Sequence, residues 1–303
     1  MKIKKVIVST KKTSLEHYKE CTDFLSNLLP PDELEEKRHE HKNHYASLNL
    51  IKEVLTRHGI EFERSYMPYS EFDDFKGKDL IICVGGDGTV LNSSQYTRDK
   101  TPVLTVRSDK KSSGALCEID AKDFEAALER LYKDDFAIEE WTRAKARFEI
   151  DAWTHTAHVE DLYALNEFFV GTRHNPAMGA YEITHNGKTE YQRSSGVVIS
   201  TGTGHSGWHG NIPFTDEDFP RTAKELQFIV RETRKTDNYE IKKGTVRLGE
   251  VLYIKSKMDV DGCISIDGDY NKRMFNFPRG NVVEITVADT PLYVTKFKDL
   301  CKG

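Results

Sequence analysis

Three glycines surround a single carboxylate in the stretch Gly85-Gly86-Asp87-Gly88-Thr89, which directly follows an apolar run at residues 80–84. Glycine lets the backbone adopt positive φ angles and lets a ligand approach the chain closely. Successive backbone N–H groups in such a turn form an anion-binding concavity, and a following helix N-terminus would add its dipole. Because a central carboxylate repels phosphate, we expect Asp87 to act on a proton or on a metal ion.

This glycine-rich turn has three interpretations. It is a structural turn in which Asp87 caps the following helix, a phosphate loop of a kinase, or that loop with Asp87 as the general base for a hydroxyl. The turn is not a Walker A loop, since no Gly-Lys-Ser/Thr follows, and it does not fit GxGxxG. The pattern favours phosphate-transfer chemistry over a plain turn.

Three further segments carry groups suited to a polar ligand. Residues 164–167 (ALNE) place an amide beside a carboxylate, a pair that can bind hydroxyls and an exocyclic amine or simply face a loop. Residues 195–208 form a strand and a Ser/Thr/Gly loop ending in Trp208, suited to phosphate, ribose and a stacked base, or to a hairpin tip. Residues 267–269 (Asp-Gly-Asp) predict a tight turn whose default role is structural.

Alternating strand and helix signals predict a parallel-sheet, Rossmann-like α/β domain over residues 1–134 that carries the GGDGT turn. Strands are predicted at residues 5–9, 61–66, 80–84 and 103–106. Helices are predicted at residues 32–58, ended by Gly59, and at residues 123–132.

Short, often alternating segments after Asp135 predict a mostly antiparallel, β-rich domain over residues 135–290. Asn186-Gly187 predicts a type I′ hairpin turn, and residues 222–228 carry a helical pattern. Residues 291–303 predict one more strand and a tail that returns to either domain. The remaining predicted strands cover residues 146–150, 181–185, 197–200, 252–257, 263–266 and 282–287.

The composition excludes several classes of protein. A chain of 303 residues with 38% hydrophobic and 31% charged residues is typical of a polar globular protein. A net charge of −5 gives no electrostatic case for nucleic-acid or membrane binding. Five scattered cysteines without CxxC spacing indicate reduced thiols and no zinc cluster. With no apolar run of transmembrane length and no visible targeting segment, we expect a cytoplasmic protein.

The charged run at residues 33–44 contains His39, His41 and His44. Metal binding and a solvated helix face are the two interpretations. We favour the solvated face, because no other ligand cluster joins these histidines, and we assign no metal-ligating side chains.

Taken in order, four motifs resemble the NAD kinase (ATP-NAD kinase) family over nearly the whole chain. They are GGDGT (85–89), ALNE (164–167), SSGVVISTGTGHSGW (194–208) and IDGD…PRGNVVEITVADTPLYV (266–294). GGDGT alone is shared with lipid kinases and is similar to the phosphofructokinase loop, whereas the ordered set is much more specific. Gly114-Ala115-Leu116-Cys117 and Thr201-Gly202-Thr203-Gly204 are most similar to the mitochondrial-type branch.

The resemblance implies an α/β domain, a β-rich domain over residues 135–290 that is a nucleotide-binding β-sandwich, and a cleft between the two. It implies transfer of the ATP γ-phosphate to the 2′-hydroxyl of the adenosine ribose of NAD, with Mg²⁺ or another divalent cation, in a homodimer or homotetramer. Asp87 is then the catalytic general base. The resemblance assigns phosphate contacts to Gly85, Gly86, Gly88 and Thr89, nicotinamide-side contacts to Asn166 and Glu167, the adenosine pocket to Thr201, Thr203, Gly204, His205, Ser206 and Trp208, and a further ligand contact to Asp267.

Some positions depart from the family pattern. Thr105-Val106-Arg107 replaces the usual Gly-Ile-Asn, and Arg107 is expected either to neutralise a diphosphate or to pair with Asp109. His205 and Gly207 replace a typical Ser and Ala, and Trp208 stands where Tyr is usual.

Two alternatives remain open at this level. A lipid kinase of the diacylglycerol or sphingosine type would carry a downstream Gly-Thr-x-Asn motif, which the sequence lacks. A catalytically inactive NAD(P)-binding regulator is disfavoured by the intact Asp87. The sequence does not distinguish NAD from NADH, or ATP from polyphosphate.

Overall fold

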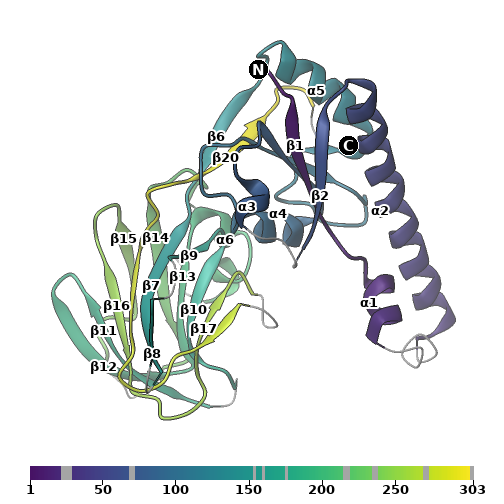
Figure 1. Cartoon of the computed structure of the whole chain (residues 1–303). Coiled ribbons are helices and arrows are strands. Elements are labelled where there is room, and N and C mark those ends of the chain that lie inside the picture. The colour runs from purple at the N-terminus through teal and green to yellow at the C-terminus, as the bar shows by residue number, and fades with distance from the viewer. Residues whose placement is uncertain are drawn as a thin grey trace. The chain divides into compact units, whose positions relative to one another are not determined.

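The computed structural model describes residues 1–21, 29–67, 72–152, 155–158, 161–174, 177–213, 219–233, 238–268 and 273–300. The chain divides into two compact units (Figure 1). Unit 1 comprises Met1–Glu139 and Leu292–Gly303, and unit 2 comprises Glu140–Pro291. Strand β6 (Ala137–Trp141) runs across this chain boundary.

A sheet with the strand order β2-β1-β3-β4-β20-β6, and with β5 pairing β4, forms the centre of unit 1. Strands β1, β2, β3 and β4 pair in parallel, as does β20 with β4. Every residue of β3 is buried, as expected for an apolar strand covered on both faces. The four predicted strands are confirmed. The bounds are β1 (Lys5–Lys11), β2 (Glu61–Met67), β3 (Leu80–Gly85), β4 (Val103–Arg107), β5 (Ile119–Asp120) and β20 (Leu292–Lys296).

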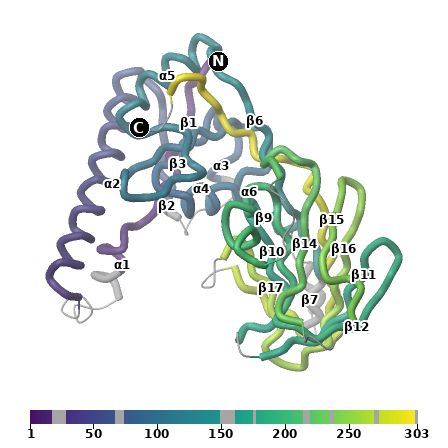
Figure 2. Tube along the Cα trace, turned by 180° about the vertical axis from the view of Figure 1, so that it is seen from behind, coloured from purple at the N-terminus to yellow at the C-terminus, as the bar shows by residue number. Residues whose placement is uncertain are grey.

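Helices cover the sheet of unit 1. The longest described helix, α2 (Pro31–Arg57), lies beside the sheet in Figures 1 and 2 and buries Leu48, Ile51, Val54 and Leu55. Both predicted helices are confirmed, and Gly59 (φ 66°) follows α2 in the left-handed conformation expected of a helix end. The other helices are α1 (Ser14–Cys21), α3 (Phe72–Phe75), α4 (Asp87–Ser94), the 3₁₀ turn η2 (Ala121–Asp123) and α5 (Phe124–Tyr132).

Unit 2 contains two sheets with the orders β15-β14-β13-β10-β17-β18 and β12-β11-β16-β19-β7-β8, and β9 pairs β7. The apolar residues of both sheets share one buried cluster, with Phe168 and Ile199 from the first and Ile254 and Ile285 from the second. The predicted β-sandwich is therefore confirmed. The bounds are β7 (Ala144–Ala152), β8 (His155–His158), β9 (Leu162–Ala164), β10 (Glu167–Thr172), β11 (Gly179–His185), β12 (Lys188–Ser194), β13 (Gly196–Ser200), β14 (Glu225–Arg231), β15 (Lys243–Arg247), β16 (Leu252–Ser256), β17 (Gly262–Ile266), β18 (Met274–Asn276) and β19 (Val282–Val287).

The turn prediction between β11 and β12 is confirmed, because Asn186 and Gly187 both have positive φ (50° and 75°). The helical prediction for residues 222–228 is wrong. That segment enters β14, which pairs with β13 on one side and β15 on the other. Leu226 and Phe228 alternate into the sandwich core, so strand partners on both sides outweigh the local helical spacing.

Candidate active site

Asp87 is the first residue of α4 and lies where β3 ends. The N-cap position of α4 belongs to Gly86, which has no side chain to bond the first helical turn. The interpretation of Asp87 as a helix cap is therefore wrong. Its Oδ1 instead accepts a hydrogen bond of 2.8 Å from the backbone N–H of Leu116. Asp87 is thus a half-buried carboxylate held from outside its own helix, at the positive end of the helix dipole.

The glycines of the turn have different roles. A Cβ on Gly85 would lie 2.1 Å from Oγ1 of Thr89, and one on Gly86 would lie 2.6 Å from Oγ of Ser112. A Cβ on exposed Gly88 would meet nothing within 4 Å. Gly85 is therefore required for internal packing, a side chain at Gly86 would require Ser112 to rotate, and Gly88 leaves open space beside Asp87. Among the described residues, the buried hydroxyl of Thr89 has no hydrogen-bond partner, which is costly unless a ligand supplies one.

Arg107 forms a nearly buried ion pair with Asp120. Its Nε lies 2.7 Å from Oδ1 and its Nη2 lies 3.2 Å from Oδ2, with side chains 10% and 5% exposed. This hydrogen-bonded pairing raises the pKa of Arg107 and lowers that of Asp120. The expected pairing with Asp109 is wrong, because Asp120 is the strand partner of Arg107 in the β4–β5 register. The guanidinium is thereby committed to the fold.

A cavity of about 160 Å³ lies against Gly86 within unit 1. His44 borders it, with Nδ1 2.9 Å from Oγ of Ser108 and Nε2 3.1 Å from Oγ1 of Thr10. Burial lowers the pKa of His44 to about 4, so the ring is neutral at pH 7. A solvated helix face is therefore wrong for His44, although His39 is exposed. The lining includes Lys11, His44, Gly86, Ser108, Lys111 and Ser112.

In unit 2, Asp267 holds the 164–167 turn in place. Its carboxylate accepts hydrogen bonds from the backbone N–H groups of Asn166 (2.7 Å), Leu165 (3.2 Å) and Glu167 (3.2 Å). Burial raises the pKa of Asp267 to about 6, although these donors oppose the shift. The carboxylate therefore acts as a scaffold for the neighbouring backbone. Asp269, the other acid of the predicted turn, lies outside the described residues.

Glu167 opens β10 and is only 4% exposed. Burial raises its pKa to about 8, and the nearby charge of Asp267 adds to the shift. Oε2 of Glu167 and Oδ1 of Asn166 are both buried and have no hydrogen-bond partner within the described ranges of the chain. Glu167 is then protonated at neutral pH and can donate a hydrogen bond as well as accept one.

The short helix α6 (Gly202–His205) is tied to the same turn. Oγ1 of Thr201 donates to the carbonyl of Leu165 (2.5 Å) and accepts from the N–H groups of Thr203 (3.1 Å) and Gly204 (3.3 Å). A Cβ on Gly204 would lie 2.4 Å from the carbonyl oxygen of Asn166. Oγ1 of Thr203 is a further buried hydroxyl for which the described part of the chain offers no hydrogen-bond partner.

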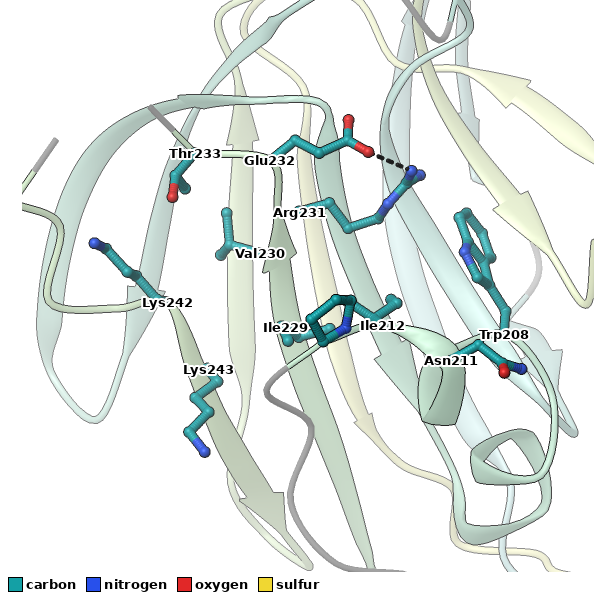
Figure 3. Close-up of a pocket in the computed structure, with 11 residues that line it drawn as sticks. Trp208, Asn211, Ile212, Ile229, Val230, Arg231, Glu232, Thr233, Lys242 and Lys243 are labelled. Atoms are coloured by element: carbon teal, nitrogen blue, oxygen red, sulfur yellow. Dashed lines mark hydrogen bonds and ion pairs between the residues drawn. The ribbon is translucent and has the colours of Figure 1, made fainter. Parts of the chain in front are cut away.

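Trp208 lies on one side of a pocket of about 700 Å³ in unit 2 (Figure 3). Its ring centroid is 5.4 Å from that of Phe169, and the guanidinium carbon of Arg231 lies 4.9 Å from the indole centroid. Lys242 and Lys243 lie across the pocket from Trp208 in Figure 3. The pocket therefore combines an aromatic wall with basic side chains. Exposed Ser206 donates to the carbonyl of Thr203 (3.0 Å).

The structure brings Asn166, Glu167, Thr201, Gly204 and Asp267 together in unit 2 through the contacts above. Gly85 to Thr89 form one turn in unit 1. Arg107 is engaged elsewhere, as described. Sequence reasoning missed the Leu116 N–H, His209, and the Lys and Ser side chains at residues 108–112. The Lys/Ser-rich run at residues 108–112 and the i, i+4 spacing of His205 and His209 were the sequence signals that could have indicated these groups.

The described residues contain no group of three or more His, Cys, Asp or Glu side chains arranged to hold a metal ion. None of the described helices has the length and hydropathy needed to cross a membrane.

Comparison with known proteins identifies the family. Residues 6–136 match the model of the ATP-NAD kinase N-terminal domain. An NAD kinase of Pyrococcus furiosus is 31% identical over 232 residues, which cover 76% of this chain and 75% of that protein. A probable NADH kinase of Oryza sativa subsp. japonica is 25% identical over 276 residues, covering 82% and 80%. The chain belongs to the NAD kinase family, so the resemblance noted from its motifs is confirmed.

The fold is also that of a solved structure. An NAD kinase from Archaeoglobus fulgidus in complex with ATP superposes with a TM-score of 0.64 at 18% identity, covering 97% of this chain and 94% of that one. The similarity in fold therefore extends over both units of the chain.

Proposed function

We propose that the protein is an NAD kinase that transfers the γ-phosphate of ATP to the 2′-hydroxyl of the adenosine ribose of NAD. The observation that carries the proposal is Asp87, a carboxylate fixed through Oδ1 beside a glycine turn with open space at Gly88. Within the described part of the chain, no hydrogen bond to Oδ2 of Asp87 is found. That oxygen is therefore available to a substrate hydroxyl.

In the proposed reaction, the 2′-oxygen attacks the γ-phosphorus and the bond from phosphorus to the β,γ-bridging oxygen breaks, which releases ADP. The proton of the 2′-hydroxyl passes to Oδ2 of Asp87. A ribose hydroxyl has a high pKa, so it needs a base within hydrogen-bond reach during attack. The rest of phosphoryl transfer is positioning and charge neutralisation. The N–H groups of the turn and the N-terminus of α4 supply donors for the phosphates.

We propose that a divalent cation, Mg²⁺ in particular, enters the site together with ATP. Mg²⁺ is usually held by one or two carboxylates together with substrate phosphates. The one carboxylate of the turn, Asp87, is assigned to the substrate hydroxyl, so the phosphates of ATP and water would supply the ligands of the cation. When bound, the cation neutralises charge on the phosphates.

We propose that the residues brought together in unit 2 (Asn166, Glu167, Thr201, Gly204 and Asp267) bind NAD. Asn166, Glu167 and Thr203 each present a buried polar atom that no described residue hydrogen-bonds, which suits the hydroxyl and carboxamide groups of a dinucleotide. Trp208 offers a face for an aromatic ring. We also propose that the protein is cytoplasmic, which agrees with the free thiols of Cys83, Cys117 and Cys263. We further propose that it forms a homodimer or a homotetramer, and light scattering measures the mass of the assembly.

The test is Asp87→Asn, assayed by NADP⁺ formation from ATP, Mg²⁺ and NAD. Asparagine keeps an Oδ1 acceptor for the Leu116 N–H, so the fold and NAD binding are retained. We expect a loss of roughly 10²–10⁴-fold in kcat, the range typical of general bases. Asp135→Asn, at an exposed position, is the matched control. Near wild-type activity of Asp87→Asn would contradict the assignment.

Parallel assays separate the alternatives. A lipid kinase would phosphorylate diacylglycerol or sphingosine in place of NAD. An inactive regulator would bind NAD(P) in calorimetry but form no NADP⁺. Comparing NAD with NADH, and ATP with polyphosphate, then defines the acceptor and the donor.

A further inference from the structure

Two histidines flank Trp208 and bond to each other. His205 ends α6 and His209 begins the 3₁₀ turn η3 (His209–Asn211). Their Nδ1 atoms lie 3.2 Å apart, and the side chains belong to residues that are only 9% and 1% exposed. Because two like nitrogens share this contact, one must donate an N–H and the other must accept it. The pair is thus a buried hydrogen bond that spans the Trp208 turn.

The backbone around this bond is tightly wound. The N–H of Gly207 donates to the carbonyl of Gly204 (2.9 Å), and the side chain of Asn211 donates to the carbonyl of Gly207 (2.7 Å). A Cβ on Gly210 would lie 2.1 Å from the carbonyl oxygen of His205, so only glycine lets the second turn pack on the first. The two turns therefore meet both at their backbones and through the histidine pair.

Trp208 lies between the two histidines in the chain and forms the N-cap of η3. Its indole packs against Phe169 and over the guanidinium of Arg231, on the side that borders the 700 Å³ pocket. A rotation of η3 relative to α6 would change the angle of the indole. The histidine bond opposes that rotation, since it joins the last residue of α6 to the first residue of η3.

We propose that the His205–His209 hydrogen bond positions Trp208 as the aromatic wall on which the acceptor nucleotide rests, and that His209 is a positioning residue of the nucleotide site. The inference rests on the proposed function for the identity of the ligand, an aromatic base of NAD. His209 acts through Trp208 and need not touch the ligand. Loss of the His205–His209 hydrogen bond should therefore change KM for the ligand more than it changes kcat.

Two substitutions at His209 separate the bond from packing. His209→Phe keeps a ring of similar size but has no nitrogen to share. His209→Asn is smaller but places an amide group near the position of Nδ1, where it can donate or accept. We expect His209→Phe to raise KM for NAD about tenfold, with kcat within about twofold of wild type, in line with the loss of one buried hydrogen bond. We expect His209→Asn to stay close to wild type.

A spectroscopic measurement reports the indole itself. The chain contains three tryptophans, so incorporation of 5-fluorotryptophan gives three ¹⁹F resonances, and Trp208→Phe identifies the one from Trp208. In His209→Phe this resonance shifts or broadens without ligand, whereas in His209→Asn it does not. His209→Leu, which also lacks a ring nitrogen, serves in its place if His209→Phe does not fold.

The outcomes are distinct. Equal KM values and unchanged Trp208 resonances in the Phe and Asn variants would overturn the proposal. An equal rise of KM for NAD in the Phe and Asn variants would also overturn the proposal, because the packing of the ring would then be responsible. Absence of NAD phosphorylation by the wild-type protein would refute the proposed function instead, and the ligand-free ¹⁹F spectra would still test the positioning of Trp208.

Discussion

The buried carboxyl of Glu167 makes the stability of unit 2 depend on pH in the direction opposite to that of most acids. Its pKa is about 8 in the folded protein and 4.5 for an ordinary glutamate, because burial disfavours the charged form. Between these values the folded protein holds a proton that the unfolded chain releases. The free energy of unfolding must therefore fall as pH rises from about 4.5 to about 8.

The size of this effect follows from the shift. At 1.36 kcal/mol per pKa unit, the loss between pH 5 and pH 7 is on the order of 3 kcal/mol. Glu167→Gln keeps the shape and polarity of the side chain but cannot ionise. We expect the variant to lack this part of the pH dependence and to be more stable than wild type at pH 7 to 8, with the advantage shrinking toward pH 5.

Urea unfolding followed by tryptophan fluorescence measures the effect, and Trp208 provides a reporting side chain within unit 2. Curves at pH 5, 6, 7 and 8 give the free energy of unfolding for each variant. Glu284→Gln, at an exposed position on β19, is the matched control and should follow wild type. The reasoning is refuted if wild type and Glu167→Gln change in parallel over this range.

Two further predictions concern unit 1. Gly85→Ala should unfold the turn, because its Cβ would lie 2.1 Å from the Thr89 hydroxyl. Gly88→Ala should keep the wild-type melting temperature, because its Cβ would meet nothing within 4 Å, but it should raise KM for ATP. Circular dichroism melts with NADP⁺ assays check both, and an unchanged KM in Gly88→Ala would show that no ligand approaches there. Arg107→Leu should cost roughly 3–5 kcal/mol of stability by leaving Asp120 buried and unpaired, with KM for NAD unchanged. A raised KM at unchanged stability in urea titrations would restore the diphosphate role of Arg107.

Much of the fold was predictable because its signals are local. The apolar run before the glycine turn could only be a covered strand, and β3 is buried throughout. Asn186-Gly187 predicted its hairpin because few residue pairs accept two positive φ angles. The helix predicted for residues 222–228 was wrong for the opposite reason. Their helical spacing was real, but the cross-strand partners that make β14 a strand lie far along the chain.

The candidate site also contains contacts that could not be predicted, because they depend on residues distant in the sequence. Arg107 was expected either to neutralise a diphosphate or to pair with Asp109, which lies two residues away in the sequence. The carboxylate of Asp109 instead accepts from the N–H of Lys111, and β-strand register places Asp120 against Arg107.

By itself, the sequence determined which chemistry is present: a carboxylate in a glycine turn, an amide–acid pair and a Ser/Thr/Gly loop ending in Trp208. These depend on residue type and short spacing, which the chain carries locally. Only the tertiary structure decided that Leu116 holds Asp87, that burial keeps Glu167 protonated, and that His205 and His209 bond across Trp208. Hydrogen-bond partners and desolvation are properties of packed neighbours, and packing joins residues that the sequence keeps apart.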